Sequence, residues 1–331
     1  MSAPSANSAT RNPLLIRFAW FAVFYNVLVI LWGALVRASG SGAGCGNHWP
    51  LCNGQVIPVS PGFHTIIEFT HRMMTGGSTF IVLGLLIWTF RATAKGRAAR
   101  AFAVASTILL FNEALLGALL VKLGYVTGNE STGRMVLLSI HLSNTLLLVA
   151  ALSLTARFLS TDQAWSGLHR ARSFGWAVAG LLATIGVGVS GSMAALGDTL
   201  FPAPTLQAAF ARDFAASSPW LLRLRLVHPV SALIAAVFVI WLVGRSREGV
   251  GLGDLDRTRL AKLVLVLLFA QFALGVADVL LLAPAWMQLI HLLGADFYWV
   301  ALVLLAADTI WPDAAKHSKV PAPTPLTTTH A

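Results

Sequence analysis

The chain has 331 residues, of which 56% are hydrophobic and 11% are charged, and its mean hydropathy is +0.74. A soluble domain of this size needs far more charge to cover its surface, so the composition predicts a polytopic membrane protein. The net charge of +10 comes from basic residues in short loops between apolar runs, a topological bias that indicates no nucleic-acid partner.

Eight apolar runs are long enough to form helices that cross a bilayer, which takes about 20 residues. No short hydrophobic core followed by a small-residue cleavage site precedes the first run, so we expect no cleaved signal peptide. An even number of spans places both termini on one side of the membrane. The runs cover residues 15–37, 64–90, 101–122, 135–157, 173–194, 220–244, 260–282 and 287–311.

Lysine and arginine predict which side that is. The two termini and the connections on their side carry 16 of the 23 basic residues, whereas the opposite loops and helix ends carry seven. The positive-inside rule therefore places both termini in the cytoplasm of a protein integral to the cell membrane, with residues 312–331 as a disordered tail. The loops at 38–63, 123–134, 195–219 and 283–286 then face outside.

The first outer loop contains the only two cysteines, Cys45 and Cys52, in the segment CGNHWPLC. The outer face is oxidising, so we predict a disulfide, with free or redox-cycling thiols as the alternative. A zinc site needs more ligands than the single His48 inside this loop. Trp49 and Pro50 suit a lid that lies at the membrane interface.

The chain also repeats itself in two halves. The matched residues are His71 with His228, His141 with His291 and Gly117 with Gly275, and a fainter match joins segment 33–42 to 186–193. We therefore predict an all-α fold of two pseudo-symmetric four-helix bundles, residues 14–157 and 173–311, related by a pseudo-two-fold axis.

The repeat selects four histidines at one depth, about 6–12 Å below the outer surface at 1.5 Å per helical residue. Two histidines from facing helices are what a haem iron needs as axial ligands. A lone buried histidine more often hydrogen-bonds across helices, and copper or zinc sites gather three or four ligands at one point. Four histidines paired by a repeat favour two haem sites.

The segments GALVRASGSGAGCGNHWPLCNG (33–54) and EFTHR (68–72) resemble the first outer loop and second helix of the haem A synthase family. The resemblance extends over residues 14–311. It implies oxidation of the C8 methyl group of haem O to a formyl group, through hydroxylated intermediates, to give haem A for terminal oxidases.

The resemblance also assigns residues. It implies His228 and His291 as ligands of a haem b cofactor, His71 and His141 as ligands of the substrate haem, and Glu68 as a residue needed for activity. Cys45 and Cys52 correspond to the family's cysteine pair. Expected partners are haem O and membrane lipid, with the haem O-forming prenyltransferase, oxidase assembly factors and a second copy of the chain as candidates.

Glu68 lies three residues before His71, so the two share one face of a helix. We hypothesise that its carboxylate accepts or relays a proton, and the alternative is an ion pair with Arg72. Haem propionates or lipid headgroups are the candidate partners of the outer arginines, Arg37, Arg72, Arg134, Arg223 and Arg225. For Glu113 and its repeat partner Gln271, the pattern favours interhelical hydrogen bonds over pocket contacts.

Other functions remain open from the sequence. A bis-histidine b-type cytochrome for quinol-linked electron transfer explains the histidines but not Glu68 or the cysteine loop. A haem O-forming prenyltransferase needs aspartate-rich motifs, and the nearest candidates, Asp254 and Asp256, lie in a cytoplasmic loop. A non-catalytic haem carrier or assembly scaffold is the third alternative.

Overall fold

The computed structural model describes residues 12–161, 174–247 and 255–311. In these ranges the regular structure is helical, apart from one isolated bridge between Cys52 and Gln55. Eight helical segments there are long and apolar enough to cross a membrane. The predicted all-α polytopic fold is therefore confirmed. The tail at 312–331, predicted to be disordered, lies outside the described residues.

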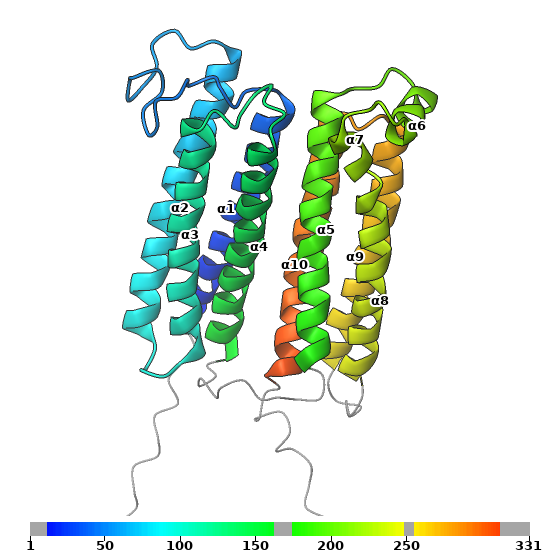
Figure 1. Ribbon diagram of the computed structural model, residues 1–331. Coiled ribbons are helices and arrows are strands. Elements are labelled where there is room, and N and C mark those ends of the chain that lie inside the picture. The colour runs from blue at the N-terminus through cyan, green and yellow to red at the C-terminus, as the bar shows by residue number, and fades with distance from the viewer. Residues whose placement is uncertain (1–11, 162–173, 248–254, 312–331) are drawn as a thin grey trace, which may run out of the picture.

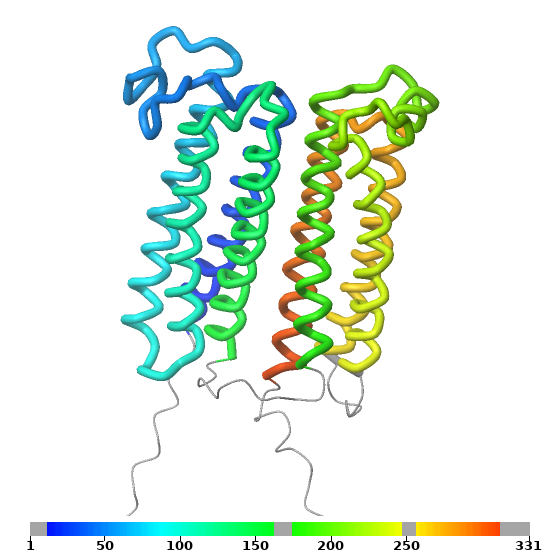
Figure 2. Tube along the Cα trace, viewed as in Figure 1, coloured from blue at the N-terminus to red at the C-terminus, as the bar shows by residue number. Residues whose placement is uncertain are grey.

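The long helices form two groups of four (Figures 1 and 2). The first group contains α1 (Pro13–Ala38), α2 (Phe63–Ala92), α3 (Ala98–Lys122) and α4 (Thr132–Thr161). The second contains α5 (Phe174–Leu200), α8 (Val227–Arg247), α9 (Leu255–Leu280) and α10 (Ala285–Ile310). The groups meet where α4 packs on α5 and α10, and where α1 packs on α10.

Two features of the α5–α8 connection depart from the predicted spans. A short helix, α6 (Leu206–Phe214), occupies part of the predicted loop, and the Thr205 hydroxyl accepts from the Ala208 N–H at 3.1 Å as its cap. The sixth span is also interrupted between α7 (Trp220–Leu224) and α8. Pro229 has no N–H to donate to the Arg225 carbonyl, which favours a break in the helix at this point.

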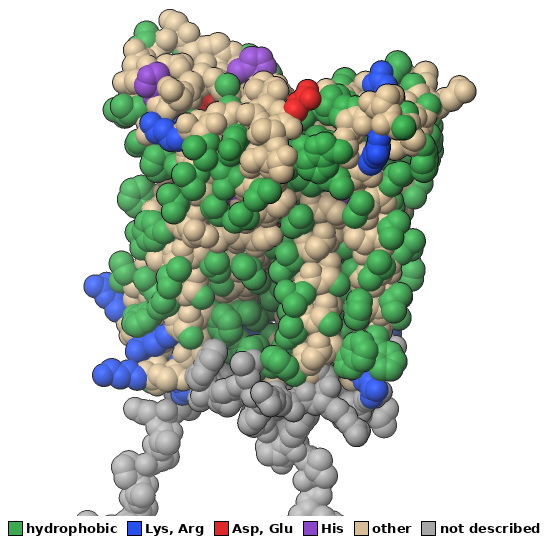
Figure 3. Space-filling model, in the orientation of Figure 1, with side chains coloured by type: hydrophobic (Ala, Val, Ile, Leu, Met, Phe, Trp, Pro, Cys, Tyr) green, Lys and Arg blue, Asp and Glu red, His purple; other side chains and the backbone are tan. Residues whose placement is uncertain are grey.

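Two large hydrophobic clusters fill the molecule: one lies within the first group of helices, and the other fills the second group and extends onto α4. Leu15, Val82 and Leu152 are buried in the first, and Val239 and Leu302 in the second. A third, smaller cluster joins α4, α5 and α7 at the loop-rich end. The outer surface is largely apolar between the two ends (Figure 3), as lipid contact requires.

Polar contacts also connect the two groups. Near the middle of α10, the Trp299 indole N–H donates to the Leu146 carbonyl of α4 at 2.7 Å. Further along the same two helices, the Arg157 guanidinium pairs with the Asp308 carboxylate at 2.6 Å. Because both pairs join α4 to α10, these helices fix the relative position of the bundles.

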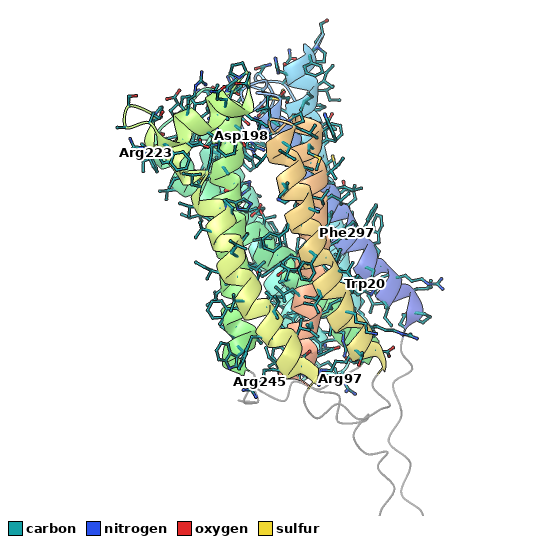
Figure 4. All side chains as sticks on the ribbon, turned by 90° about the vertical axis from the view of Figure 1, so that its right-hand side faces the viewer. Trp20, Arg97, Asp198, Arg223, Arg245 and Phe297 are labelled. Atoms are coloured by element: carbon teal, nitrogen blue, oxygen red, sulfur yellow. A yellow bond between two sulfur atoms is a disulfide. The ribbon has the colours of Figure 1, made fainter. Side chains whose placement is uncertain are left out.

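The described chain begins and ends at the same end of the molecule (Figure 1). Arg97 and Arg245 lie at this end, whereas Asp198 and Arg223 lie at the opposite end (Figure 4). The opposite end also carries the loop from residue 39 to 62 and helices α6 and α7. It is the end that the sequence predicts to face outside.

Candidate functional site

The four repeat-matched histidines lie on α2, α4, α8 and α10, in the halves of these helices nearer the loop-rich end. The rings of His228 and His291 face each other across their bundle, with centroids 6.4 Å apart and planes at 86°. His71 and His141 lie on α2 and α4 of the other bundle. The structure thus groups the four imidazoles into two pairs, one in each bundle.

Each imidazole lies against a glycine of the preceding long helix. A Cβ atom would lie 2.8 Å from His228 Cε1 if built on Gly191, and 3.0 Å from His71 Cε1 if built on Gly33. The corresponding distance is 3.4 Å from Gly275 to His291 and 4.0 Å from Gly117 to His141. The glycines leave the space that the rings occupy.

These contacts add detail to the faint sequence match between 33–42 and 186–193, which paired no single residues. Gly33 of the first segment and Gly191 of the second lie against the matched histidines, His71 and His228.

The imidazoles differ in what their Nδ1 atoms meet. His228 Nδ1 is 3.2 Å from the Val187 carbonyl and 3.3 Å from the Ser190 hydroxyl. His141 Nδ1 is 3.2 Å from Glu113 Oε1. Among the described residues, the buried Nδ1 atoms of His71 and His291 have no hydrogen-bond partner.

This arrangement fits a haem held by two histidines. Two imidazole nitrogens on one metal are about 4 Å apart, given bonds of about 2 Å each, and the separation of the His228 and His291 rings accommodates this. Neutral imidazoles also enter an apolar bundle at lower cost than fixed charges. The side chains of His228 and His291 are therefore suited to hold haem iron between them.

Glu68 is buried at the start of α2 and both of its oxygens have partners. Oε2 accepts a hydrogen bond from the Cys45 N–H at 2.8 Å, and Oε1 pairs with the Arg72 guanidinium. Arg72 Nη1 in turn donates to the His48 carbonyl at 2.9 Å and the Leu51 carbonyl at 2.5 Å. The ion pair anticipated as the alternative role of Glu68 is present, and it ties the cysteine loop to α2.

Cys45 and Cys52 form the predicted disulfide, and both are buried. The loop that they close rests on the first turn of α2. The Thr65 hydroxyl donates to the Gly44 carbonyl at 2.8 Å, and a Cβ atom on Gly44 would overlap the His64 carbonyl group. Only glycine permits this close approach. The loop therefore contacts the first turn of α2, the part of this helix that precedes His71.

The other outer arginines also have protein partners. Arg134 Nη1 donates to the Asn129 carbonyl at 2.7 Å, and Arg223 Nη2 donates to the Ala216 carbonyl at 2.5 Å. Arg225, at the repeat position of Glu68, pairs with Asp198 at 3.1 Å and lies 3.5 Å from Asp213. Contacts of these arginines with an anion stay a prediction.

Asp213 of α6 belongs to this outer network. Burial raises the pKa of its carboxyl above the usual value, and the nearby Arg225 guanidinium opposes that rise. The pair joins α6 to the interrupted sixth span.

Arg37 has a role that the sequence did not indicate. Its Nη1 donates to the Ala195 carbonyl at 2.7 Å and the Thr199 hydroxyl at 2.8 Å, both on α5. Its Nη2 donates to Gln288 Oε1 of α10 at 2.7 Å. The guanidinium thus connects α1 of one bundle to two helices of the other. Its position at the end of an apolar run was the only sequence signal.

Glu113 makes the interhelical hydrogen bonds that the sequence favoured. Oε2 accepts from Asn144 Nδ2 at 2.6 Å, and Oε1 accepts from the Thr145 hydroxyl, both on α4. The contact with His141 was not anticipated, because sequence spacing does not show which α3 side chain faces which α4 side chain.

The comparisons with known proteins agree with this architecture. A family model described as cytochrome oxidase assembly protein (COX15-CtaA) matches residues 16–303. The chain belongs to this family. Its eight apolar helices make this member of the COX15-CtaA family an integral membrane protein.

Similar proteins carry two different names. A "Protoheme IX farnesyltransferase" of Thermus thermophilus is 42% identical over 304 residues, which are 89% of this chain and 48% of that protein. "Heme A synthase" proteins match shorter parts. That of Alkalihalophilus pseudofirmus is 38% identical over 41% of each chain, and that of Bacillus licheniformis is 44% identical over 30% of this chain and 32% of its own. This chain thus spans about half the length of the Thermus relative.

Proposed function

We propose that this protein is a haem A synthase, which oxidises the C8 methyl group of haem O to a formyl group through hydroxylated intermediates. The observation that carries the proposal is the asymmetry between two otherwise matched histidine pairs. In the described chain, the first bundle has a buried carboxylate, Glu68, one helical turn before His71, and this carboxylate contacts the disulfide loop. The second bundle has Arg225 at the corresponding position.

In this proposal His228 and His291 hold a haem b cofactor, and His71 and His141 hold the substrate haem O. Haem iron held by these histidines would supply redox chemistry for the methyl oxidation, which also needs an external electron acceptor and an oxygen atom from water or O2. The chain's part is to orient the two haems and to accept protons. The protein lies in the cell membrane with both termini in the cytoplasm, so that the disulfide loop covers the outer end of the first bundle.

Glu68 is the proposed proton acceptor. Breaking a methyl C–H bond releases a proton, and the carboxylate lies one helical turn from His71 on the same helix face. Its partners, the Cys45 N–H and the Arg72 guanidinium, hold it in one orientation. The same contacts couple the state of the carboxylate to the position of the cysteine loop.

We do not propose prenyltransferase activity for this chain, although the Thermus relative carries that name. The aligned part is 48% of that protein and 89% of this chain, and the cytochrome oxidase assembly model matches residues 16–303. The chain also lacks an Asp-x-x-x-Asp motif of the kind that binds Mg-diphosphate. The likeness instead supports the haem O-forming prenyltransferase as a partner, beside oxidase assembly factors.

A bis-histidine b-type cytochrome for quinol-linked electron transfer is the second candidate, because the facing rings of His228 and His291 suit it equally well. It gives no role to the buried Glu68 and its contact with the cysteine loop.

The test is haem extraction with mass analysis from cells expressing the chain with and without the haem O-forming enzyme. Wild-type protein should give haem A or hydroxylated haem only when haem O is made. Glu68→Gln should lower product about a hundredfold or more while the haem absorbance is kept, because a proton acceptor is lost.

The matched control is Arg72→Lys, which keeps a cation beside Glu68 and should retain most of the activity. If both variants lose product formation to the same extent, Glu68 only holds the cysteine loop in place and is not the proton acceptor. Wild-type protein that holds only haem b and reduces rapidly with quinol would support the cytochrome instead.

A further inference from the structure

The carboxylate of Glu113 lies at the back of one histidine of the first pair. Glu113 Oε1 is 3.2 Å from His141 Nδ1, which leaves Nε2 as the ring nitrogen available to a metal. The ring N–H is not yet aligned with this oxygen, since His141 Nδ1 makes no hydrogen bond of good angle. Such contacts commonly tighten when the ligand binds.

The position of this carboxylate is fixed by α4 itself. Asn144 Nδ2 donates to Oε2 at 2.6 Å and also to the Leu109 carbonyl at 2.9 Å, and the Thr145 hydroxyl donates to Oε1. Asn112 Nδ2 holds Asn144 Oδ1 at 2.7 Å. The donors around Glu113 therefore hold the carboxylate facing His141.

Among the described residues of the second bundle, no carboxylate is paired with a histidine of the His228–His291 pair in the way that Glu113 is paired with His141. Gln271 occupies the repeat position of Glu113, and Gly294 occupies that of Asn144, where a Cβ atom on Gly294 would overlap the Gln271 amide nitrogen. Within the described ranges, Gln271 Nε2 and His291 Nδ1 both lack hydrogen-bond partners. His228 meets only a backbone carbonyl and a hydroxyl. A carboxylate thus faces the ring of His141 but not those of His228 or His291.

We propose that Glu113 is a positioning residue of the first haem site: its carboxylate accepts a hydrogen bond from the Nδ1–H of His141, which leaves Nε2 free for the iron. A carboxylate behind a ligating histidine fixes its tautomer and makes the imidazole a stronger donor. A stronger axial donor favours the ferric state of the bound haem. Glu113 thereby sets the affinity and the potential of the substrate site independently of the cofactor site.

This inference rests on the proposed haem site at His71 and His141, and its test uses the full chain in detergent with ferric protoporphyrin IX as the probe. Haem titration and optical redox titration are made on wild type, Glu113→Gln and Gln271→Glu. The two substitutions exchange the repeat positions and are close in shape.

Glu113→Gln should raise the midpoint potential of one haem and weaken its binding by about 10- to 100-fold, with the other haem unchanged. The affected haem should be the one that His141→Ala removes. Gln271→Glu should lower the potential of the other haem. A merely structural role would change the unfolding temperature of the haem-free protein and leave the potentials alone.

Unchanged potentials and affinities in Glu113→Gln, or an equal shift of both haems, would overturn the inference. Wild-type protein that binds no haem at His71 and His141 gives a different failure, because it contradicts the proposed function itself together with this inference.

Discussion

At the scale of single residues, histidine and glycine act in pairs. All four imidazoles lie against a glycine of a neighbouring helix, and those of His71 and His228 lie closer than a Cβ atom on that glycine would ordinarily allow. Because an imidazole at the end of a side chain moves more readily than a helix backbone, a methyl group added at the glycine would displace the ring rather than the helix. The glycines therefore protect the ligand positions more than the fold.

Gly191→Ala should remove haem from the second bundle without unfolding the protein. The new Cβ atom would lie 2.8 Å from His228 Cε1, whereas alanine itself is better than glycine in a helix by about 1 kcal/mol. Haem per protein, measured by absorbance, should fall while the unfolding temperature of the haem-free chain stays equal or rises. Gly186→Ala on the same helix is the control, since nothing lies within 4 Å of its Cβ position. Equal haem content in the two variants would contradict the assigned contact.

At the scale of helices and loops, the first outer loop and α2 form one unit. The disulfide closes the loop, and Arg72 holds two of its carbonyls while it also pairs with Glu68. The Cys45 N–H then reaches the second oxygen of Glu68. Cys45 is thus both a partner in the disulfide and a hydrogen-bond donor to Glu68. Breaking the disulfide would therefore act on the Glu68 carboxylate through Cys45 alone.

Arg37 connects α1 to α5 and α10, whereas the sequence predicted a haem propionate or a lipid headgroup as its partner. We expect Arg37→Met to lower the unfolding temperature of the haem-free protein clearly, because each charge-assisted hydrogen bond is worth roughly 1.5–3 kcal/mol and its guanidinium makes three. Arg223→Met is the matched control, since its guanidinium bonds only to carbonyls of its own loop, and exposed substitutions change stability by about 0.5 kcal/mol or less.

Thermal unfolding in detergent distinguishes the two arginines. If Arg37 instead serves only a haem propionate, its substitution would leave the haem-free protein as stable as wild type and would destabilise the haem-loaded form alone.

At the scale of the whole molecule, the sequence predicted the spans and their pairing because both follow from hydrophobic length and repetition. The eight predicted runs correspond to the eight helical segments that can cross a membrane. The sequence did not predict α6 or the interruption before His228, since short polar helices and helix breaks carry weak periodic signals. Contacts such as Glu113 with His141 and Arg37 with Gln288 depend on how helices rotate against each other, which no spacing along one helix reveals.

The placement of the two histidine pairs in different bundles leads to a prediction about haem occupancy. Because the histidine pairs lie in different bundles, each site should fill independently, as distant sites usually behave additively. A variant with His71→Ala and His141→Ala should keep one haem per chain, and a variant with His228→Ala and His291→Ala should keep the other. Haem stoichiometry and difference spectra of the purified variants measure this, and the two spectra should sum to that of wild type. Loss of both haems from either variant would mean that the bundles share one site. The contacts between α4 and α10 would then couple the two haem sites as well as join the bundles.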